Sequence, residues 1–368
     1  MAEQKEIILP NFTPSKGVNK LDIEQYLAEA QEGNNAAEGS VILDIRTPAE
    51  YESGHIAGAH SFPLFSNDER AIVGTIYKKE GKDIAVEKGL EFVGPKLHKF
   101  VKEAKRFGKS NKFYLYCWRG GMRSGSMAWL LSTAGLDVTT LIGGYKAYRQ
   151  SFLDNIIPKD WRFITLSGST GVGKTELLKE LQKRGEQVLD LEGLANHKGS
   201  AFGGIGQEEQ PTTEEYINRI HQKLREFTPS KVVWVESESI LVGKCFIQVE
   251  LFAKLKTSNF YTITMEREER VKRLVEEYGY LNKELIIESL EKISKRMGYD
   301  KSKEAIDSFN NGNIEKAVSL ALDYYDKLYS NSSSKRTGKE LEVLDLSGNN
   351  HKAIAEYLME KNRMEEKR

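Results

Sequence analysis

The segment Gly168-Ser-Thr-Gly-Val-Gly-Lys-Thr175 restricts the fold of this chain more than any other feature of its sequence. It matches the phosphate-loop pattern G-x4-G-K-[ST] in full. An apolar segment at 163–167 precedes it and a helical pattern at 176–181 follows it, which is the setting that such a loop needs. Because the loop amides and the positive end of the helix must converge on one anion, the sequence predicts a parallel strand–loop–helix unit of an α/β fold.

Each residue of this loop has an expected contribution to binding a phosphorylated ligand. The glycines Gly168, Gly171 and Gly173 let the backbone approach phosphate oxygens. Lys174 is expected to reach between phosphates, and Thr175 to ligate Mg²⁺, the predicted cofactor. The intervening residues Ser169, Thr170 and Val172 complete the predicted phosphate-binding set.

Acidic residues follow two later apolar segments. Glu236 ends the segment 231–236 and is the expected acid partner of the phosphate loop; a strand-end salt bridge is the alternative. Asp190 and Glu192 follow 187–190 and are further candidates for metal binding or base catalysis. The glycine-rich stretch 192–206 is predicted to be a substrate loop, in which His197 either contacts substrate or faces solvent.

A second motif surrounds one of the two cysteines, Cys117. It follows the apolar segment 113–117 and precedes an apolar helix at 127–131. Loop amides, the helix N-terminus and two arginines should favour the thiolate and bind an oxyanion. The predicted loop residues after the cysteine are Trp118, Arg119, Gly120, Gly121, Met122, Arg123 and Ser124. Cys245 has no such setting and is predicted to be structural.

Short apolar segments at 41–45, 138–142, 260–264 and 341–346 add strands to these units and indicate parallel sheets. We expect four regions: 1–152, an α/β domain; 153–265, the phosphate-loop core; 266–330, a helical subdomain; and 331–368, a strand and a helix.

Three arginines of the expected helical subdomain are spaced for one helical face: Arg267, Arg270 and Arg273. They are expected either to clamp phosphates or tRNA, or to pair with neighbouring glutamates.

Composition excludes several classes of protein. Two cysteines among 368 residues exclude a disulfide scaffold and a four-cysteine zinc site, so no structural zinc is expected. No apolar run is long enough to cross a membrane, and the N-terminus lacks secretory features, so a cytoplasmic protein is expected. The 54 basic and 54 acidic residues balance, yet residues 96–149 hold eleven Lys or Arg against Glu103 and Asp137. We expect this basic excess to surround Cys117 and to attract nucleic acid.

The stretch Asp44-Ile-Arg-Thr-Pro-Ala-Glu-Tyr, followed by Gly54-His-Ile-Ala-Gly-Ala59, resembles the signature of rhodanese domains. That resemblance implies a cysteine that carries sulfur or selenium. Arg123, however, lies six residues after Cys117 rather than five, a spacing shared with cysteine phosphatases. Chalcogen transfer and dephosphorylation therefore both remain open, although Tyr116 stands where many such phosphatases have histidine.

The order of the motifs resembles the tRNA 2-selenouridine synthase family, a fusion of a rhodanese domain with a P-loop NTPase-like domain. The matching segments are 67–77, 117–124, 168–175, 191–203 and 235–239. The resemblance implies that selenium replaces sulfur at a wobble uridine in a tRNA anticodon loop. It also implies selenophosphate and geranyl diphosphate as substrates, an S-geranyl intermediate, and an enzyme that supplies selenophosphate. The alternatives are a small-molecule kinase or ATPase with a regulatory rhodanese or phosphatase-like domain, and an adaptor that uses both loops only for binding.

Overall fold

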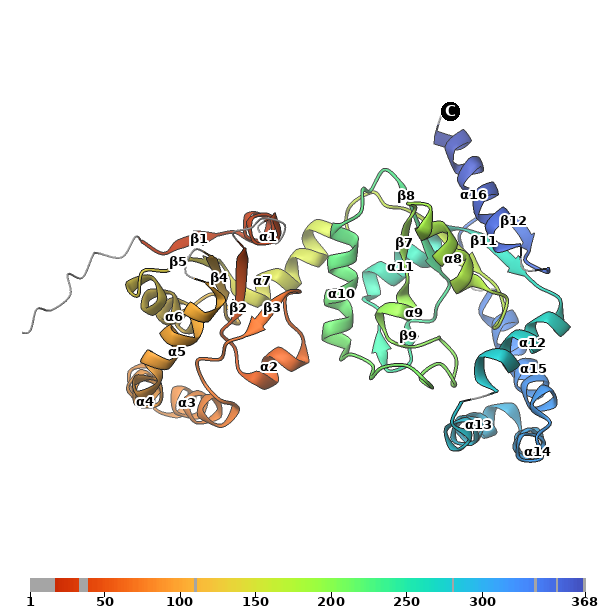
Figure 1. Ribbon diagram of the computed structural model, residues 1–368, viewed down its shortest axis with the longest axis horizontal. Helices are drawn as coiled ribbons and strands as arrows, with labels where there is room; N and C mark the ends of the chain where they lie inside the picture. Colours follow the sequence, from red (N-terminus) through yellow and green to blue (C-terminus); the bar gives the residue numbers. More distant parts are fainter. Residues whose placement is uncertain are drawn as a thin grey trace, which may run out of the picture. The chain divides into compact units, whose positions relative to one another are not determined.

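Two parallel sheets organise the chain, which confirms the predicted α/β class (Figure 1). The computed structural model describes residues 17–32, 39–108, 111–279, 281–333, 336–348 and 350–366. The chain divides into two units, Met1–Asp154 and Asn155–Arg368. Among the described residues, no helix is both long and apolar enough to cross a bilayer.

The first sheet has the strand order β1-β5-β4-β2-β3, with every neighbouring pair parallel. Its strands are β1 (Asn19–Leu21), β2 (Ser40–Asp44), β3 (Ala59–Ser61), β4 (Lys112–Tyr116) and β5 (Asp137–Leu141). The predicted segments 41–45, 113–117 and 138–142 correspond to β2, β4 and β5. These three strands are buried along nearly their whole length, because helices cover the sheet.

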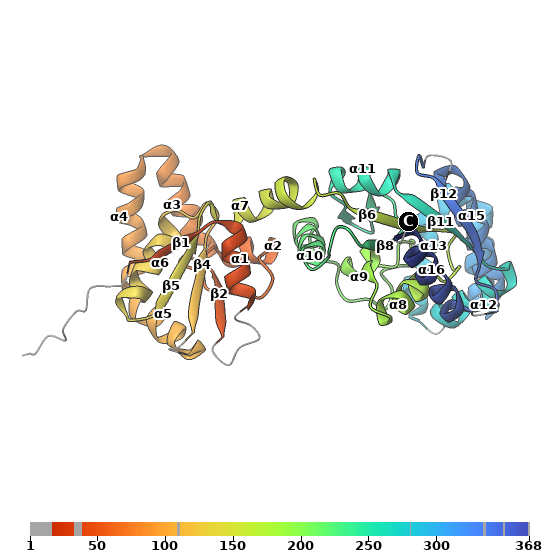
Figure 2. The ribbon, with the colours of Figure 1, turned by 90° about the horizontal axis from the view of Figure 1, so that it is seen from above.

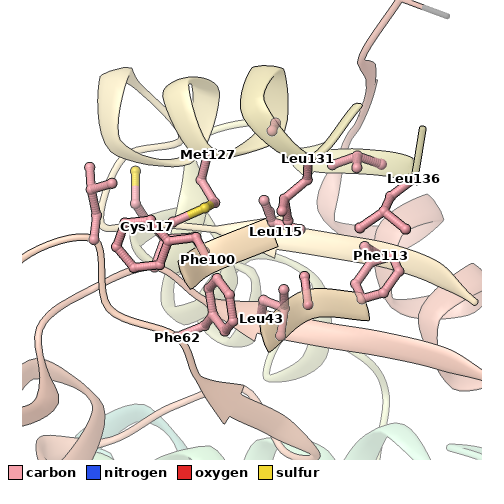
Figure 3. Packing of buried hydrophobic residues seen from close by; sticks show 14 of the residues in the cluster. Leu43, Phe62, Phe100, Phe113, Leu115, Cys117, Met127, Leu131 and Leu136 are labelled. Carbon is pink, nitrogen blue, oxygen red and sulfur yellow. The ribbon is translucent and has the colours of Figure 1, made fainter. Parts of the chain in front are cut away.

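Seven α-helices of the described residues belong to this first unit. They are α1 (Ile23–Glu32), α2 (Pro48–Ser53), α3 (Asn67–Lys79), α4 (Lys82–Val93), α5 (Leu97–Ala104), α6 (Met122–Thr133) and α7 (Gly144–Ser151). Helices α3 and α4 lie side by side (Figure 2). Cys117 lies near one end of the core that β4, α5 and α6 share, with Phe113 and Leu136 at the other end (Figure 3).

The second sheet has the order β12-β11-β6-β8-β7 and is also parallel. Its strands are β6 (Arg162–Ser167), β7 (Gln187–Leu189), β8 (Val232–Glu236), β11 (Asn259–Thr264) and β12 (Glu340–Asp345). They agree with the predicted segments to within one residue. A small hairpin, β9 (Leu241–Val242) and β10 (Cys245–Phe246), follows β8.

Helices of the second unit fall into two groups. Those around the sheet are α8 (Lys174–Lys183), α9 (Leu191–Leu194), α10 (Thr213–Arg225), α11 (Val249–Thr257) and α16 (His351–Glu366). The helical subdomain consists of α12 (Arg267–Tyr278), α13 (Lys283–Met297), α14 (Tyr299–Asn310) and α15 (Ile314–Ser333), which Figure 1 shows grouped together. Helix α15 extends beyond residue 330, the expected end of this subdomain.

Candidate functional sites

The phosphate loop joins the end of β6 to the start of α8, as its pattern predicts. Gly168 passes so close to the Ile263 carbonyl of β11 that a Cβ would collide with it. Gly173 has a φ of +86° and would collide with the His351 ring if it carried a side chain. Lys174 Nζ donates to the carbonyl oxygens of Gly168 at 2.8 Å and Ser169 at 3.3 Å, so its ammonium group lies over the loop.

Arginines of α12 brace this loop from the helical subdomain. Arg270, which is only 7% exposed, donates Nε to the Thr170 carbonyl at 3.0 Å and pairs with Asp326 of α15 at 2.6 Å. Arg273 donates to the Gly171 carbonyl at 3.3 Å and pairs with Glu176. Since Arg267 also pairs with an aspartate of α15, the structure favours ion pairs within the unit over a tRNA clamp.

Carboxylates gather beside the loop at the carboxyl ends of β7 and β8. Glu236 Oε1 accepts the backbone N–H of Glu192 at 2.8 Å, and Thr175 Oγ1 donates to Glu192 Oε2 at 3.4 Å. Glu238, which lies in the matching segment 235–239 but was not among the predicted site residues, approaches Glu192, since a Cβ on Gly199 would contact both carboxylates. Glu236 therefore lies beside the phosphate loop, where its expected acid partner would be, and its contact is the Glu192 N–H rather than a strand-end salt bridge.

Burial and mutual repulsion raise the pKa values of these carboxyl groups. Burial first, and then the charges of Glu238 and Glu236, raise the pKa of Glu192 to about 10. Burial and the charge of Asp190 raise the pKa of Glu236, and burial raises that of Glu238 against the opposing effect of Lys174. The cluster therefore binds protons when no cation neutralises it.

These residues fit Mg²⁺ in combination with a phosphate ligand. Glu236 Oε2 is buried and has no hydrogen-bond partner among the described residues, and Thr175 lies within reach of Glu192. No three His, Cys, Asp or Glu side chains in the described parts of the chain already form a complete metal site. Mg²⁺ commonly takes one or two protein carboxylates, with phosphate and water supplying its other ligands.

His197 lies inside the substrate loop rather than in solvent. Its ring is packed so closely that a Cβ on Gly203 or Gly243 would press against it. Burial lowers the pKa of His197, which favours the neutral ring. Gln210 fixes the same loop by donating to the carbonyls of Ala195 at 3.0 Å and Val242 at 3.1 Å. No spacing in the sequence indicated this role of Gln210.

Cys117 begins the loop that joins β4 to α6 and is 3% exposed. Its Sγ lies 3.2 Å from Ser124 Oγ, which also donates to the Gly121 carbonyl at 3.3 Å. The start of α7 holds the loop from behind, because Tyr145 N–H donates to the Cys117 carbonyl at 2.9 Å. Trp118 is half-buried and packs against Tyr145, with ring centroids 5.8 Å apart.

Arg123 of this loop is held in an ion pair. Its guanidinium pairs with Glu50 of α2 through nitrogen–oxygen distances of 2.6 and 3.2 Å. Burial alone would raise the pKa of Glu50, but hydrogen bonds from Arg123 outweigh burial and lower it. Arg119, by contrast, is exposed at the loop. The ion pair weakens the dephosphorylation alternative, in which this arginine would bind phosphate.

The rhodanese-type signature forms an internal support for the loop. Asp44 and Arg46 are both completely buried and pair at 2.6 Å. Arg46 also donates to the Gly54 carbonyl at 2.6 Å, and its guanidinium stacks 3.8 Å from the centroid of the Tyr145 ring. Because the Tyr145 N–H donates to the Cys117 carbonyl, the Asp44–Arg46 ion pair stabilises the loop through Tyr145.

A cleft of about 1120 Å³ opens over Cys117, and α3 and α4 form one of its walls. Its apolar lining includes Phe65, Val73, Val86 and Met122. Its basic lining residues are Arg70, Lys78, Lys82, Arg119 and Arg123. No spacing in the sequence indicated that the 67–77 segment would face the cysteine.

The prediction that the basic residues of 96–149 surround Cys117 is wrong for several of them. Lys96 pairs with Glu69, and Arg123 pairs with Glu50. Lys105 and Arg106 follow α5 and lie a few residues before β4, whereas Cys117 follows the other end of β4. The five residues of β4 separate its two ends by about 16 Å, so these cations lie at the end of the strands opposite to Cys117. Lys109, also counted in that excess, lies outside the described residues.

Cys245 is completely buried, and its Sγ donates to the Pro211 carbonyl at 3.3 Å. Burial raises the pKa of this thiol. These contacts agree with a structural role.

Comparisons with known proteins agree with both loops. The family profile described as the tRNA 2-selenouridine synthase AAA domain matches residues 161–365, and that of the rhodanese-like domain matches residues 24–151. A protein named tRNA 2-selenouridine synthase from Pseudomonas syringae pv. syringae (strain B728a) is 31% identical to this chain, and the match covers 87% of this chain and 94% of the relative. A protein of the same name from Shewanella woodyi (strain ATCC 51908 / MS32) is 33% identical, and the match covers 79% of this chain and 87% of the relative. The resemblance drawn from the motifs is confirmed. This chain belongs to the tRNA 2-selenouridine synthase family.

Proposed function

We propose that this enzyme converts the 2-thiouridine at the tRNA wobble position into 2-selenouridine through an S-geranyl intermediate. The proposal that the reaction has two steps, alkylation and then exchange of sulfur for selenium, rests on one observation. The second unit holds a phosphate loop beside a carboxylate cluster, while the first holds a buried thiol under a cleft with basic residues in its lining. The names of the relatives support the overall reaction on tRNA.

The first step is alkylation at the phosphate loop. The 2-thio sulfur attacks C1 of geranyl diphosphate, the C1–O bond breaks with its electrons on diphosphate, and the base loses its N3 proton. Lys174 and the loop amides stabilise the departing diphosphate. Bound Mg²⁺ would supply additional neutralising charge, held by Thr175 and by carboxylates of Glu192 and Glu236.

The second step is exchange at the Cys117 loop. Selenium of selenophosphate attacks C2, and the C2–S bond breaks to release geranyl thiol. Water then cleaves the phosphorus–selenium bond, which yields phosphate and returns a proton to N3. Arg119 and the loop amides bind the selenophosphate anion. Cys117, the thiol at the base of the cleft, is the catalytic residue: it gives its proton to the departing geranyl sulfur and regains a proton from solvent.

The tRNA anticodon loop binds over this cleft. Arg70, Lys78 and Lys82 attract its phosphates, and the apolar lining accepts the opened base and the alkyl group. A selenophosphate-forming enzyme supplies the donor.

The test is mass spectrometry of nucleosides from 2-thiouridine tRNA after separate incubations. Geranyl diphosphate alone should yield S-geranyl-2-thiouridine, and selenophosphate should convert that product into 2-selenouridine. Neither step should need ATP. An absolute requirement for ATP, or selenouridine formed without any geranylated intermediate, would refute the proposal.

A further inference from the structure

The hydroxyl of Ser124 lies between the thiol of Cys117 and a backbone carbonyl. Ser124 belongs to the first turn of α6 and is completely buried. Its Oγ lies 3.2 Å from Cys117 Sγ and 3.3 Å from the Gly121 carbonyl oxygen. A hydroxyl group has one proton, so it donates to the sulfur or to the carbonyl, but not fully to both. The sulfur–hydroxyl contact therefore has two forms, which differ in the group that donates.

The two forms correspond to the two protonation states of Cys117. The thiol donates its proton to Ser124 Oγ, while the hydroxyl donates to the Gly121 carbonyl. A thiolate has no proton to give, so the hydroxyl turns and donates to the sulfur. That turn leaves no buried acceptor unpaired, because the Gly121 carbonyl also accepts the Gly125 N–H at 3.0 Å. A hydrogen bond to a charged acceptor is stronger than one to a neutral carbonyl, which favours the turn.

A thiolate at this position depends on such a donor. Cys117 is 3% exposed, so water solvates its sulfur poorly. The guanidinium of Arg123 is paired with Glu50. Of the described side chains, only the Ser124 hydroxyl makes a hydrogen bond with Cys117 Sγ. Ser124 is therefore placed to stabilise the charge that Cys117 acquires when it loses its proton.

We propose that Ser124 is a positioning residue of the exchange step, and that its hydroxyl turns from the Gly121 carbonyl to Sγ as Cys117 gives up its proton. The inference rests on the proposed function, in which selenium attacks C2 and the C2–S bond breaks. The electron pair of that bond takes the Cys117 proton, which yields geranyl thiol and a thiolate at Cys117. Ser124 donates to this thiolate until solvent returns a proton to the sulfur.

The experiment measures exchange on purified S-geranyl-2-thiouridine tRNA with saturating selenophosphate. Ser124→Ala should lower kcat at least about tenfold, because the thiolate loses a charge-assisted hydrogen bond. Its KM for tRNA should stay unchanged, since the buried side chain is out of reach of RNA. Ser132→Ala, which replaces another buried serine of α6, is the matched control and should keep the wild-type kcat.

A second substrate separates this role from a merely structural one. An anticodon stem-loop whose 2-sulfur carries a 4-nitrophenyl group releases a stabilised thiolate that needs no proton from Cys117. Ser124→Ala should therefore exchange this group nearly as fast as the wild type does. An equally large loss of kcat with both substrates would overturn the inference, because the defect would then be independent of proton transfer.

The Cys117→Ala variant distinguishes failure of this inference from failure of the proposed function. It should lose exchange of the geranyl group, as Ser124→Ala does to a smaller extent. Normal exchange by Cys117→Ala would refute the catalytic role in the proposed function. Loss of exchange in Cys117→Ala, together with a wild-type kcat in Ser124→Ala, would overturn only the role of Ser124.

Discussion

At the scale of residues, Arg123 shows how a fold can redirect a motif. Its position six residues after Cys117 left chalcogen transfer and dephosphorylation open. In the structure its guanidinium is bound to Glu50, which also accepts the Thr47 N–H at 2.9 Å in the capping box of α2. The sequence could not reveal this, because the two residues are 73 positions apart.

Replacement of Cys117 by alanine tests the role of the thiol. We expect selenation to fall at least about 100-fold, as when a catalytic nucleophile or acid–base group is removed, with geranylation retained. Cys245→Ala is the matched control, since that buried thiol lies in the other unit and donates only to the Pro211 carbonyl. Nucleoside mass spectrometry measures both products, and normal selenouridine from the Cys117 variant would contradict the assignment.

The carboxylate cluster makes stability depend on pH. The pKa of Glu192 is raised to about 10 in the fold, above its ordinary value of 4.5, so the folded state binds protons that the unfolded chain releases. In the absence of Mg²⁺, the unfolding free energy of the second unit should therefore fall as pH rises from about 5 toward 9.

Urea unfolding at pH 5, 7 and 9, followed by tryptophan fluorescence in a protein whose first-unit Trp118 and Trp129 are replaced by Phe, measures this dependence. Glu192→Gln should flatten it, because the amide does not ionise, and Mg²⁺ with diphosphate should flatten it in the wild type. A wild-type stability that rises over this pH range would contradict the account.

At the scale of elements, the sequence pattern predicted the strands and loops whose formation depends on local residue chemistry. Strands β2, β4, β6 and β8 are continuous apolar segments, and both loops follow strands as predicted. Strands β1 and β3 were missed because each has three residues and little burial. The cleft wall from α3 and α4, and the approach of Glu238 to Glu192, depend on tertiary folding that no local spacing specifies.

Lys174 tests the phosphate loop as an element. Lys174→Ala should weaken diphosphate binding by about tenfold or more, since a charge-assisted hydrogen bond to phosphate is removed, and should slow alkylation. Lys179→Ala, on the exposed side of the same helix, is the control. Calorimetry with inorganic diphosphate and Mg²⁺ reports the first effect. Unchanged affinity and unchanged alkylation would show that the loop serves another ligand.

At the scale of the whole molecule, we expect the basic residues of the Cys117 cleft to bind the phosphates of the tRNA. The cations that line the Cys117 cleft replace the wider patch expected from sequence. We therefore expect reversal of Arg70, Lys78 and Lys82 to glutamate to weaken tRNA binding strongly. It should also reduce the log–log salt slope by about one unit for each tRNA phosphate that the variant no longer neutralises.

Reversal of Lys102, Lys105 and Arg106 is the matched comparison and should have a smaller effect. Filter binding of tRNA across a salt series measures both variants. A larger effect of the second set would place the RNA at the amino ends of the first sheet.

The central claim is that the two units catalyse successive steps, and complementary variants test it most directly. Cys117→Ala, given geranyl diphosphate and selenophosphate, should accumulate S-geranyl-2-thiouridine tRNA. Lys174→Ala should fail on 2-thiouridine tRNA, yet should convert that purified geranylated tRNA into selenouridine at the wild-type rate. Mass spectrometry of the nucleosides gives both answers. Loss of both steps in either variant, with the fold intact, would contradict the assignment of one step to each unit.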